Sequence, residues 1–173
     1  MNGAHFHLLV NHFPIIVPII GLLILLIGLY FKSEAVKRTA YLLFVLGSIF
    51  SILAMASGEE AEEVVEDMTE VSETYIESHE EAAETFAIVS YLLGGISLFG
   101  LWSSFKQKSF ANIVSIVTIV VALVALFFAQ KTGTTGGEIR HSEIREEVAQ
   151  FSPKMLHESK PVNDYLNLFR SAS

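Results

Sequence analysis

Four long apolar runs constrain the fold of this chain more than any other feature. They cover Phe13–Phe31, Thr39–Ser57, Thr85–Phe105 and Phe110–Gln130, and none contains a charged residue. Each run has about 20 residues, the length at which a helix crosses the hydrocarbon core of a bilayer. Helices of a soluble bundle would each keep a polar face. The sequence therefore predicts an all-α fold, a four-helix transmembrane bundle with spans at 13–31, 39–57, 85–105 and 110–130.

Composition excludes several classes of function. Apolar residues make up 51% of the 173-residue chain, and the mean hydropathy is +0.49, which argues against an ordinary soluble enzyme. The absence of cysteine excludes disulfides, thiolate metal sites and cysteine nucleophiles. A net charge of -8 argues against nucleic acid as a partner. Electron transfer or metal binding is favoured over catalysis, although an enzymatic role stays open.

Basic residues in the short connections predict the orientation in the membrane. Lys32, Lys37 and Arg38 follow the first run, and Lys106 and Lys108 follow the third. Short loops rich in Lys and Arg stay on the cytoplasmic side. We therefore expect a multi-pass protein of the bacterial inner membrane, embedded in the lipid bilayer, with both termini in the periplasm.

The segment between the second and third runs is strongly acidic. Residues 59–84 contain twelve Asp and Glu residues and no Lys or Arg. Apolar residues recur in this segment at three- and four-residue steps, which is typical of a helix. We expect an acidic extramembrane helical hairpin between helices two and three. Its charge fits a solvated surface, a weak site for divalent cations, or a docking face for a basic periplasmic redox partner.

Two further patterns concern helix packing and helix ends. Residues 131–137 (KTGTTGG) are glycine-rich and predict the end of the fourth helix, so that residues 1–141 form the transmembrane domain and residues 142–173 an extramembrane tail. Small residues also recur along the second and third runs, which allows either close helix packing or room for a flat ligand. These are Gly47, Ser51, Ala54 and Gly58 in the second run, and Ser90, Gly94 and Ser97 in the third.

Histidines are the most chemically capable side chains in the sequence. The predicted topology brings His12, His79 and His141, which are far apart in sequence, to the same outer end of the bundle. Neutral imidazole is the commonest metal ligand in proteins and also binds haem iron. The carboxylates of Glu59 and Glu138 are expected at this end as well. Each histidine alone is compatible with a structural role, whereas their gathering favours a functional one.

The chain resembles a bacterial inner-membrane family catalogued as domain of unknown function 2231. The stretch from His7 to Pro14 (HLLVNHFP) is similar to the entry motif His-Pro-x-x-Val-His-Phe-Pro, with Leu8 in place of the first proline. Thr132–Gly137 (TGTTGG) fits the family pattern Thr-Gly-x-x-Gly-Gly, and His141 follows it. Gly58, Glu59 and His79 match weaker positions in the middle. The resemblance implies four membrane helices, and relatives joined to Rieske or cytochrome c modules imply a redox setting.

The residues and the resemblance together favour a cytochrome-like protein that binds haem b in the outer half of the bundle. His12 and His79 are the expected axial ligands, with His141 as a substitute ligand or propionate partner and His7 behind them. Gly136 and Gly137 would adjoin the haem. The expected role is electron transfer at the periplasmic side of the membrane.

Two alternatives stay open at this point. The first is a non-haem site for zinc or copper, held by His12, His79, His141 and a carboxylate, either Glu59 or Glu138. The second is a cofactor-free structural subunit of a membrane complex, or a homodimer, in which the histidines make only hydrogen bonds.

Overall fold

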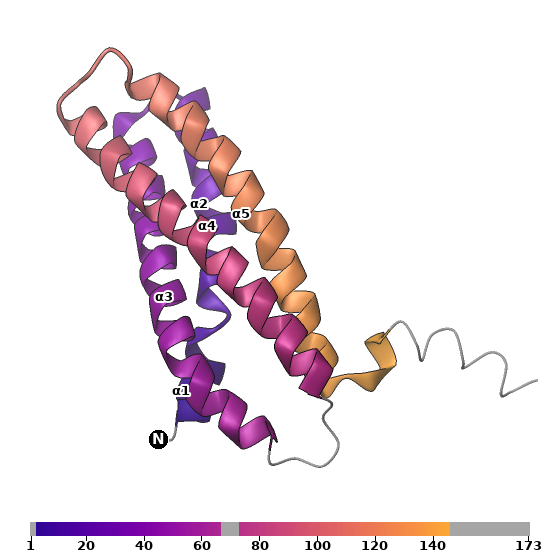
Figure 1. Ribbon diagram of the computed structural model, residues 1–173. Coiled ribbons are helices and arrows are strands. Elements are labelled where there is room, and N and C mark those ends of the chain that lie inside the picture. The colour runs from indigo at the N-terminus through magenta and orange to yellow at the C-terminus, as the bar shows by residue number, and fades with distance from the viewer. Residues whose placement is uncertain (1–2, 67–72, 146–173) are drawn as a thin grey trace, which may run out of the picture. The chain divides into compact units, whose positions relative to one another are not determined.

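The computed structural model describes residues 3–66 and 73–145, and all regular structure in these ranges is helical (Figure 1). Four of the helices are long and apolar enough to cross a membrane, as the sequence predicted. The chain divides into two units, residues 1–139 and 140–173, and the helical bundle belongs to the first. The elements are α1 (Gly3–Val10), α2 (Phe13–Tyr30), α3 (Glu34–Glu66), α4 (Glu73–Phe105), α5 (Ala111–Arg140) and a 3-10 turn (Ser142–Ile144).

Helix α3 lies in contact with most of the other helices of the bundle. It packs against α1, α2 and α4, and its Tyr41 hydroxyl lies 2.8 Å from Ser115 Oγ of α5. Helix α5 also contacts α4, where Thr132 Oγ1 donates to the carbonyl of Ala82 at 2.9 Å. Tyr41 and Phe44 of α3 are among the largest fully buried side chains of the core.

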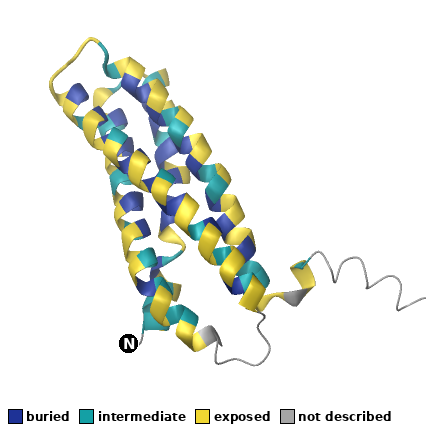
Figure 2. Cartoon of the chain, in the orientation of Figure 1, coloured by how far each residue is buried: buried dark blue, intermediate teal, exposed yellow. Residues whose placement is uncertain are grey.

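The polarity of the bundle is the reverse of that in a water-soluble protein. Large apolar side chains such as Leu23, Ile88 and Phe127 are more than half exposed on the outside, and exposed positions run along the outward faces of the helices (Figure 2). Hydroxyl side chains such as Ser97 and Thr118 are completely buried inside. Exposure of so much apolar surface to water would be unfavourable. The outward faces are therefore suited to lipid.

Helices α3 and α4 continue beyond the apolar runs. Helix α3 reaches Glu66 and α4 begins at Glu73, so both helices include part of the acidic segment. The tip of the expected hairpin, residues 67–72, lies outside the described residues. Most of the C-terminal tail, residues 146–173, also lies outside them.

The glycine-rich segment 131–137 does not end the fourth helix, and that prediction is wrong. Helix α5 continues through it to Arg140, and no glycine of the described residues has a positive φ. Glycine disfavours a helix by about 1 kcal/mol per residue relative to alanine. Packing against α4 through Thr132 offsets this cost, because most helix stability in proteins comes from tertiary contacts.

Two glycines of the small-residue stripes are sites of close helix packing. A Cβ added to Gly47 would lie 3.1 Å from Cγ of Pro18 in α2. A Cβ added to Gly94 would lie 2.6 Å from Oγ of Ser48 in α3. Of the two interpretations left open, close packing therefore applies at these positions.

A polar network joins three helices at the end of the bundle where α2 meets α3 and α4 meets α5, here called the loop end. The buried Lys37 Nζ pairs with the Glu34 carboxylate and donates to Asn112 Oδ1 at 3.0 Å. Arg38 donates to Oγ and the carbonyl oxygen of Ser104 at 2.9 and 3.0 Å. Ser104 Oγ donates in turn to Glu34 at 2.6 Å. The network satisfies the buried charge of Lys37 and ties α3 to α4 and α5.

Candidate functional site

The opposite end of the bundle, here called the histidine end, holds His7 on the short helix α1. His7 Nδ1 lies 3.0 Å from the carbonyl oxygen of Ala54 and 3.2 Å from Ser57 Oγ, both in α3. A carbonyl oxygen only accepts hydrogen bonds, so Nδ1 carries the proton. In this tautomer Nε2 carries the lone pair of the ring. His7 is therefore oriented by α3, and its Nε2 is the nitrogen that can accept a hydrogen bond or act as a ligand.

His79 on α4 is held in a corresponding way by α5. Its Nδ1 lies 3.1 Å from Thr135 Oγ1. The single proton of that hydroxyl is directed to the backbone, since Oγ1 lies 3.1 Å from the carbonyl oxygen of Thr132 and 3.2 Å from that of Lys131. When the hydroxyl donates to the backbone, as is usual for threonine in a helix, Thr135 Oγ1 accepts from Nδ1, and His79 Nε2 carries the lone pair.

A glycine lies beside each of the two imidazoles. A Cβ added to Gly136 would lie 2.9 Å from Cε1 and 3.2 Å from Nδ1 of His79. A Cβ added to Gly58 would lie 4.0 Å from Cε1 of His7, which is an ordinary contact distance. The space occupied by the His79 ring thus depends on the absence of a side chain at position 136.

The histidine end contains a similar set of residues in each half of the bundle, where one half is α1 to α3 and the other is α4 and α5. In each half a histidine, on α1 or α4, bonds to a hydroxyl residue on α3 or α5, and a glycine follows that hydroxyl directly. His7 is paired with Ser57 and Gly58, and His79 with Thr135 and Gly136. The site is therefore formed from similar sets of residues in the two halves of the bundle, although His7 lies on a short helix that has no counterpart before α4 among the described residues.

The loop end repeats this correspondence in the backbone. Lys32 follows the end of α2, and Gln107 follows the end of α4. Both residues adopt a positive φ, 52° and 50° respectively. The next amide in each half bonds to a carbonyl five residues earlier: Ser33 N to Gly28 O at 2.9 Å, and Lys108 N to Ser103 O at 3.0 Å. Both hairpins thus turn through a Schellman-type helix end.

The histidines of the two halves are near enough to interact. Both rings are half-buried; burial lowers the pKa of His79, and a positive charge on His7 would lower it further. Two imidazoles, each fixed through Nδ1, therefore belong to one end of the bundle. Asn11, in the turn after α1, adds a buried acceptor, Oδ1, that has no hydrogen-bond partner among the described residues.

The other residues expected at the site are placed differently. His12 is exposed at the N-cap of α2 and makes no side-chain capping bond. Glu59 is exposed on α3, whereas Glu138 and Gly137 are half-buried in the last turns of α5. His141 belongs to the second unit of the chain and is exposed, with Nδ1 2.9 Å from Glu143 Oε1.

The structure does not bring the expected metal ligands together as a set. Within residues 3–66 and 73–145, no group of three or more His, Asp and Glu side chains is arranged to hold a metal ion. His7, expected behind His12, lies at the same end of the bundle as His79 and influences its pKa.

Sequence reasoning missed Ala54, Ser57 and Thr135, which orient the imidazoles. A detectable signal was present in two dipeptides, Ser57-Gly58 and Thr135-Gly136, near the ends of the second and fourth helices.

The fold and the site together define a four-helix membrane protein with a pair of oriented imidazoles at one end. The chain belongs to the family described as "Predicted membrane protein (DUF2231)", which it matches over residues 3–143. No curated protein and no solved structure matches the chain. Membership agrees with the resemblance noted in the sequence and with four membrane-spanning helices.

Proposed function

We propose that His7 and His79 are the axial ligands of a haem b at the histidine end, and that the protein transfers electrons in the membrane. One observation carries this proposal: two half-buried imidazoles, one from each half of the bundle, are held by the protein through Nδ1, which leaves Nε2 of each ring available as a ligand. Metal-binding histidines are oriented in this way by a bond from the other ring nitrogen.

The donor set fits haem better than a metal ion held by protein side chains alone. A porphyrin provides four nitrogens, so the iron takes its remaining two ligands from the protein. His7 and His79 are such a pair. A zinc or copper site of the kind considered from the sequence would need at least one further ligand beside them.

Each residue of the site has a distinct role in this proposal. His7 and His79 would hold the iron, and the acceptors on α3 and α5 keep their rings in place. The absence of a side chain at Gly136 leaves space for the His79 ring. Asn11 Oδ1 offers a buried polar atom to a bound group. Haem would supply reversible one-electron exchange when bound.

This assignment replaces His12 by His7 in the expected axial pair. His12 is exposed at the start of α2, whereas His7 is half-buried and bonded to α3. His141 is exposed and bonded to Glu143. We assign neither His12 nor His141 a role in binding the haem.

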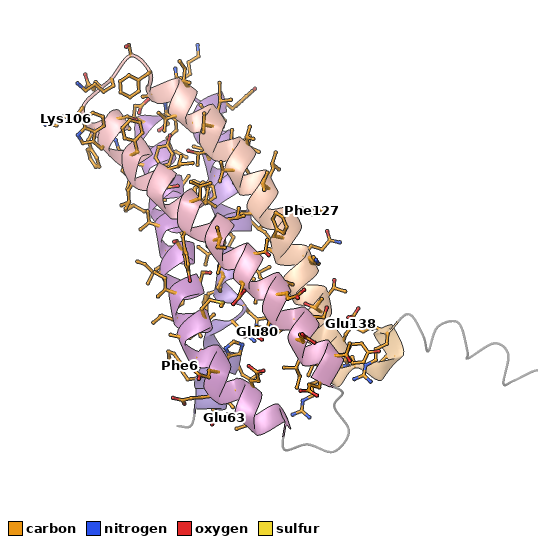
Figure 3. The ribbon with its side chains drawn as sticks, in the orientation of Figure 1. Phe6, Glu63, Glu80, Lys106, Phe127 and Glu138 are labelled. Atoms are coloured by element: carbon orange, nitrogen blue, oxygen red, sulfur yellow. The ribbon has the colours of Figure 1, made fainter. Side chains whose placement is uncertain are left out.

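Charge supports an orientation with the histidine end in the periplasm of a bacterium. Figure 3 shows Lys106 at the loop end and Glu63, Glu80 and Glu138 at the other end. Lys32 and Lys108 are also exposed at the loop end, as expected for cytoplasmic connections. The acidic surface would accelerate encounter with a basic electron carrier.

An absorption spectrum of the detergent-purified protein tests the proposal. We expect a Soret band that shifts on reduction with dithionite, together with sharp alpha and beta bands. His7→Ala and His79→Ala should lose the six-coordinate spectrum, because each removes one axial ligand. His12→Ala is the matched control and should keep it.

Other outcomes would overturn the proposal in different ways. A featureless spectrum with stoichiometric zinc or copper would make the protein a non-haem metal-binding protein. A featureless spectrum without metal, and with co-purified partners, would make it a structural subunit. Loss of haem in His12→Ala but not in His7→Ala would return His12 to the site.

A further inference from the structure

The two imidazoles of the histidine end are held by acceptors of different kinds. Resting on the proposed function of this site, we infer that Thr135 is a positioning residue for His79. Its hydroxyl fixes the proton on Nδ1 and so reserves Nε2 for the iron. His7 is positioned instead by the backbone carbonyl of Ala54, so the two ligands differ in their dependence on a side chain.

The contacts of the Thr135 hydroxyl favour its role as an acceptor for His79. Thr135 is 8% exposed, and its proton is directed to the carbonyls of Lys131 and Thr132, as is usual for threonine in a helix. The lone pairs of Oγ1 are therefore the part that His79 Nδ1 contacts at 3.1 Å. Burial lowers the pKa of His79, and the Thr132 carbonyl opposes this in part, but the hydrogen bond of Nδ1 is to Thr135.

Ser57, at the corresponding position of α3, has a weaker role. Its hydroxyl donates to the carbonyls of Leu53 at 2.9 Å and Ala54 at 3.1 Å, and it lies 3.2 Å from His7 Nδ1. The Ala54 carbonyl is closer to Nδ1, at 3.0 Å, and is part of the main chain. Removal of the Ser57 hydroxyl would leave this stronger acceptor in place.

This difference has a chemical consequence for the proposed ligands. A hydrogen bond from Nδ1–H makes the imidazole a stronger donor through Nε2. Loss of the acceptor therefore makes the imidazole a weaker electron donor to the iron. A weaker donor favours the reduced iron over the oxidised iron, because the reduced form depends less on electron donation. Substitution of Thr135 would affect the His79 side of the iron, whereas substitution of Ser57 would have a smaller effect, on the His7 side.

Imidazole nitrogen NMR of the full chain without haem tests the tautomers directly. In the wild type we expect the proton of both His7 and His79 on Nδ1. Thr135→Val keeps the shape of the side chain but removes the acceptor that lies within hydrogen-bond distance of Nδ1, so the share of the Nδ1–H tautomer of His79 should fall. Thr135→Ser should restore the wild-type signal. Thr134→Val, at the exposed neighbouring threonine whose hydroxyl bonds to the carbonyl of Gln130, should leave both histidines unchanged.

The same variants loaded with haem give a second measurement. Thr135→Val should weaken haem binding by about 10- to 100-fold, the usual effect of removing such an orienting bond, and should raise the midpoint potential. Thr134→Val should change neither quantity. Thr135→Ala provides a second test if Thr135→Val does not fold, and it should show the same changes.

The two proposals fail separately. If the wild type binds no haem, the proposed function is overturned, while the NMR signals still decide whether Thr135 fixes the His79 tautomer. If haem binds but Thr135→Val keeps a single Nδ1–H tautomer and the wild-type potential, the positioning role of Thr135 is overturned and the haem site stands.

Discussion

At the scale of single residues, a methyl group at position 136 would compete with the His79 imidazole for space. An added Cβ would lie 2.9 Å from Cε1 of that ring, closer than carbon atoms pack without displacement. Gly133, one turn earlier in α5, is different, because a Cβ there would meet only Cδ1 of Ile15 at 3.8 Å. The two glycines therefore form a matched pair for substitution.

We expect Gly136→Ala to displace the His79 ring and to weaken its bond to Thr135. Gly133→Ala should be neutral or slightly stabilising, because alanine favours a helix by about 1 kcal/mol over glycine. Thermal unfolding in detergent and the NMR signal of His79 would measure both effects. An unchanged His79 signal in Gly136→Ala would contradict the space requirement.

The residues of the site were predictable from the sequence only in part. His79 and Gly136 were identified as candidates, because topology and the family pattern both point to them. The interaction of His79 with His7 was not predicted, since it depends on an eight-residue helix, α1. So short a segment carries little helical signal of its own, and its contact with α3 arises from tertiary packing.

At the scale of helices, the two turns of the loop end carry local strain. Lys32 and Gln107 adopt a left-handed backbone conformation, which costs a residue with a side chain about 1–2 kcal/mol. Glycine adopts it without that cost. The two hairpins thus use non-glycine residues where a helix end of this type usually has glycine.

Gln107→Gly should therefore stabilise the protein by about 1 kcal/mol. Gln107→Ala keeps a Cβ and should give no comparable gain. The midpoint of thermal unfolding in detergent would compare the two variants. Equal midpoints would show that the left-handed conformation at this turn carries no measurable cost.

The helices themselves were largely predictable, because uncharged runs of about 20 residues have few other solutions than a membrane span. The positions at which the helices end were less predictable. Helix α5 passes through the glycine-rich segment to Arg140, since contacts of Thr132 with α4 outweigh the low helix propensity of glycine. Local sequence does not reveal such compensation.

At the scale of the whole molecule, the two ends of the bundle differ in charge, and this difference predicts the orientation of the protein in the membrane. Because the chain contains no cysteine, a single introduced cysteine reports its own position without background. Ser109 is exposed at the loop end, and Ser78 is exposed near His79 on α4. Substitution of either serine by cysteine changes only the atom attached to Cβ, from oxygen to sulfur.

In intact bacterial cells whose outer membrane admits the reagent, a membrane-impermeant maleimide should label Ser78→Cys. It should label Ser109→Cys only after the inner membrane is opened, because basic loops stay in the cytoplasm. The unsubstituted chain is the control and should not react. The opposite labelling pattern would place the histidine end in the cytoplasm.

The matching halves of the bundle also bear on how such a site arises. A histidine, a hydroxyl residue and a glycine recur in the same order in each half, and the turn at the loop end recurs as well. Each half contributes one oriented imidazole, so the pair arises from the packing of two similar halves and not from a single binding loop. Because a backbone carbonyl contacts one ring and a threonine hydroxyl the other, a substitution can loosen one imidazole and leave the other in place.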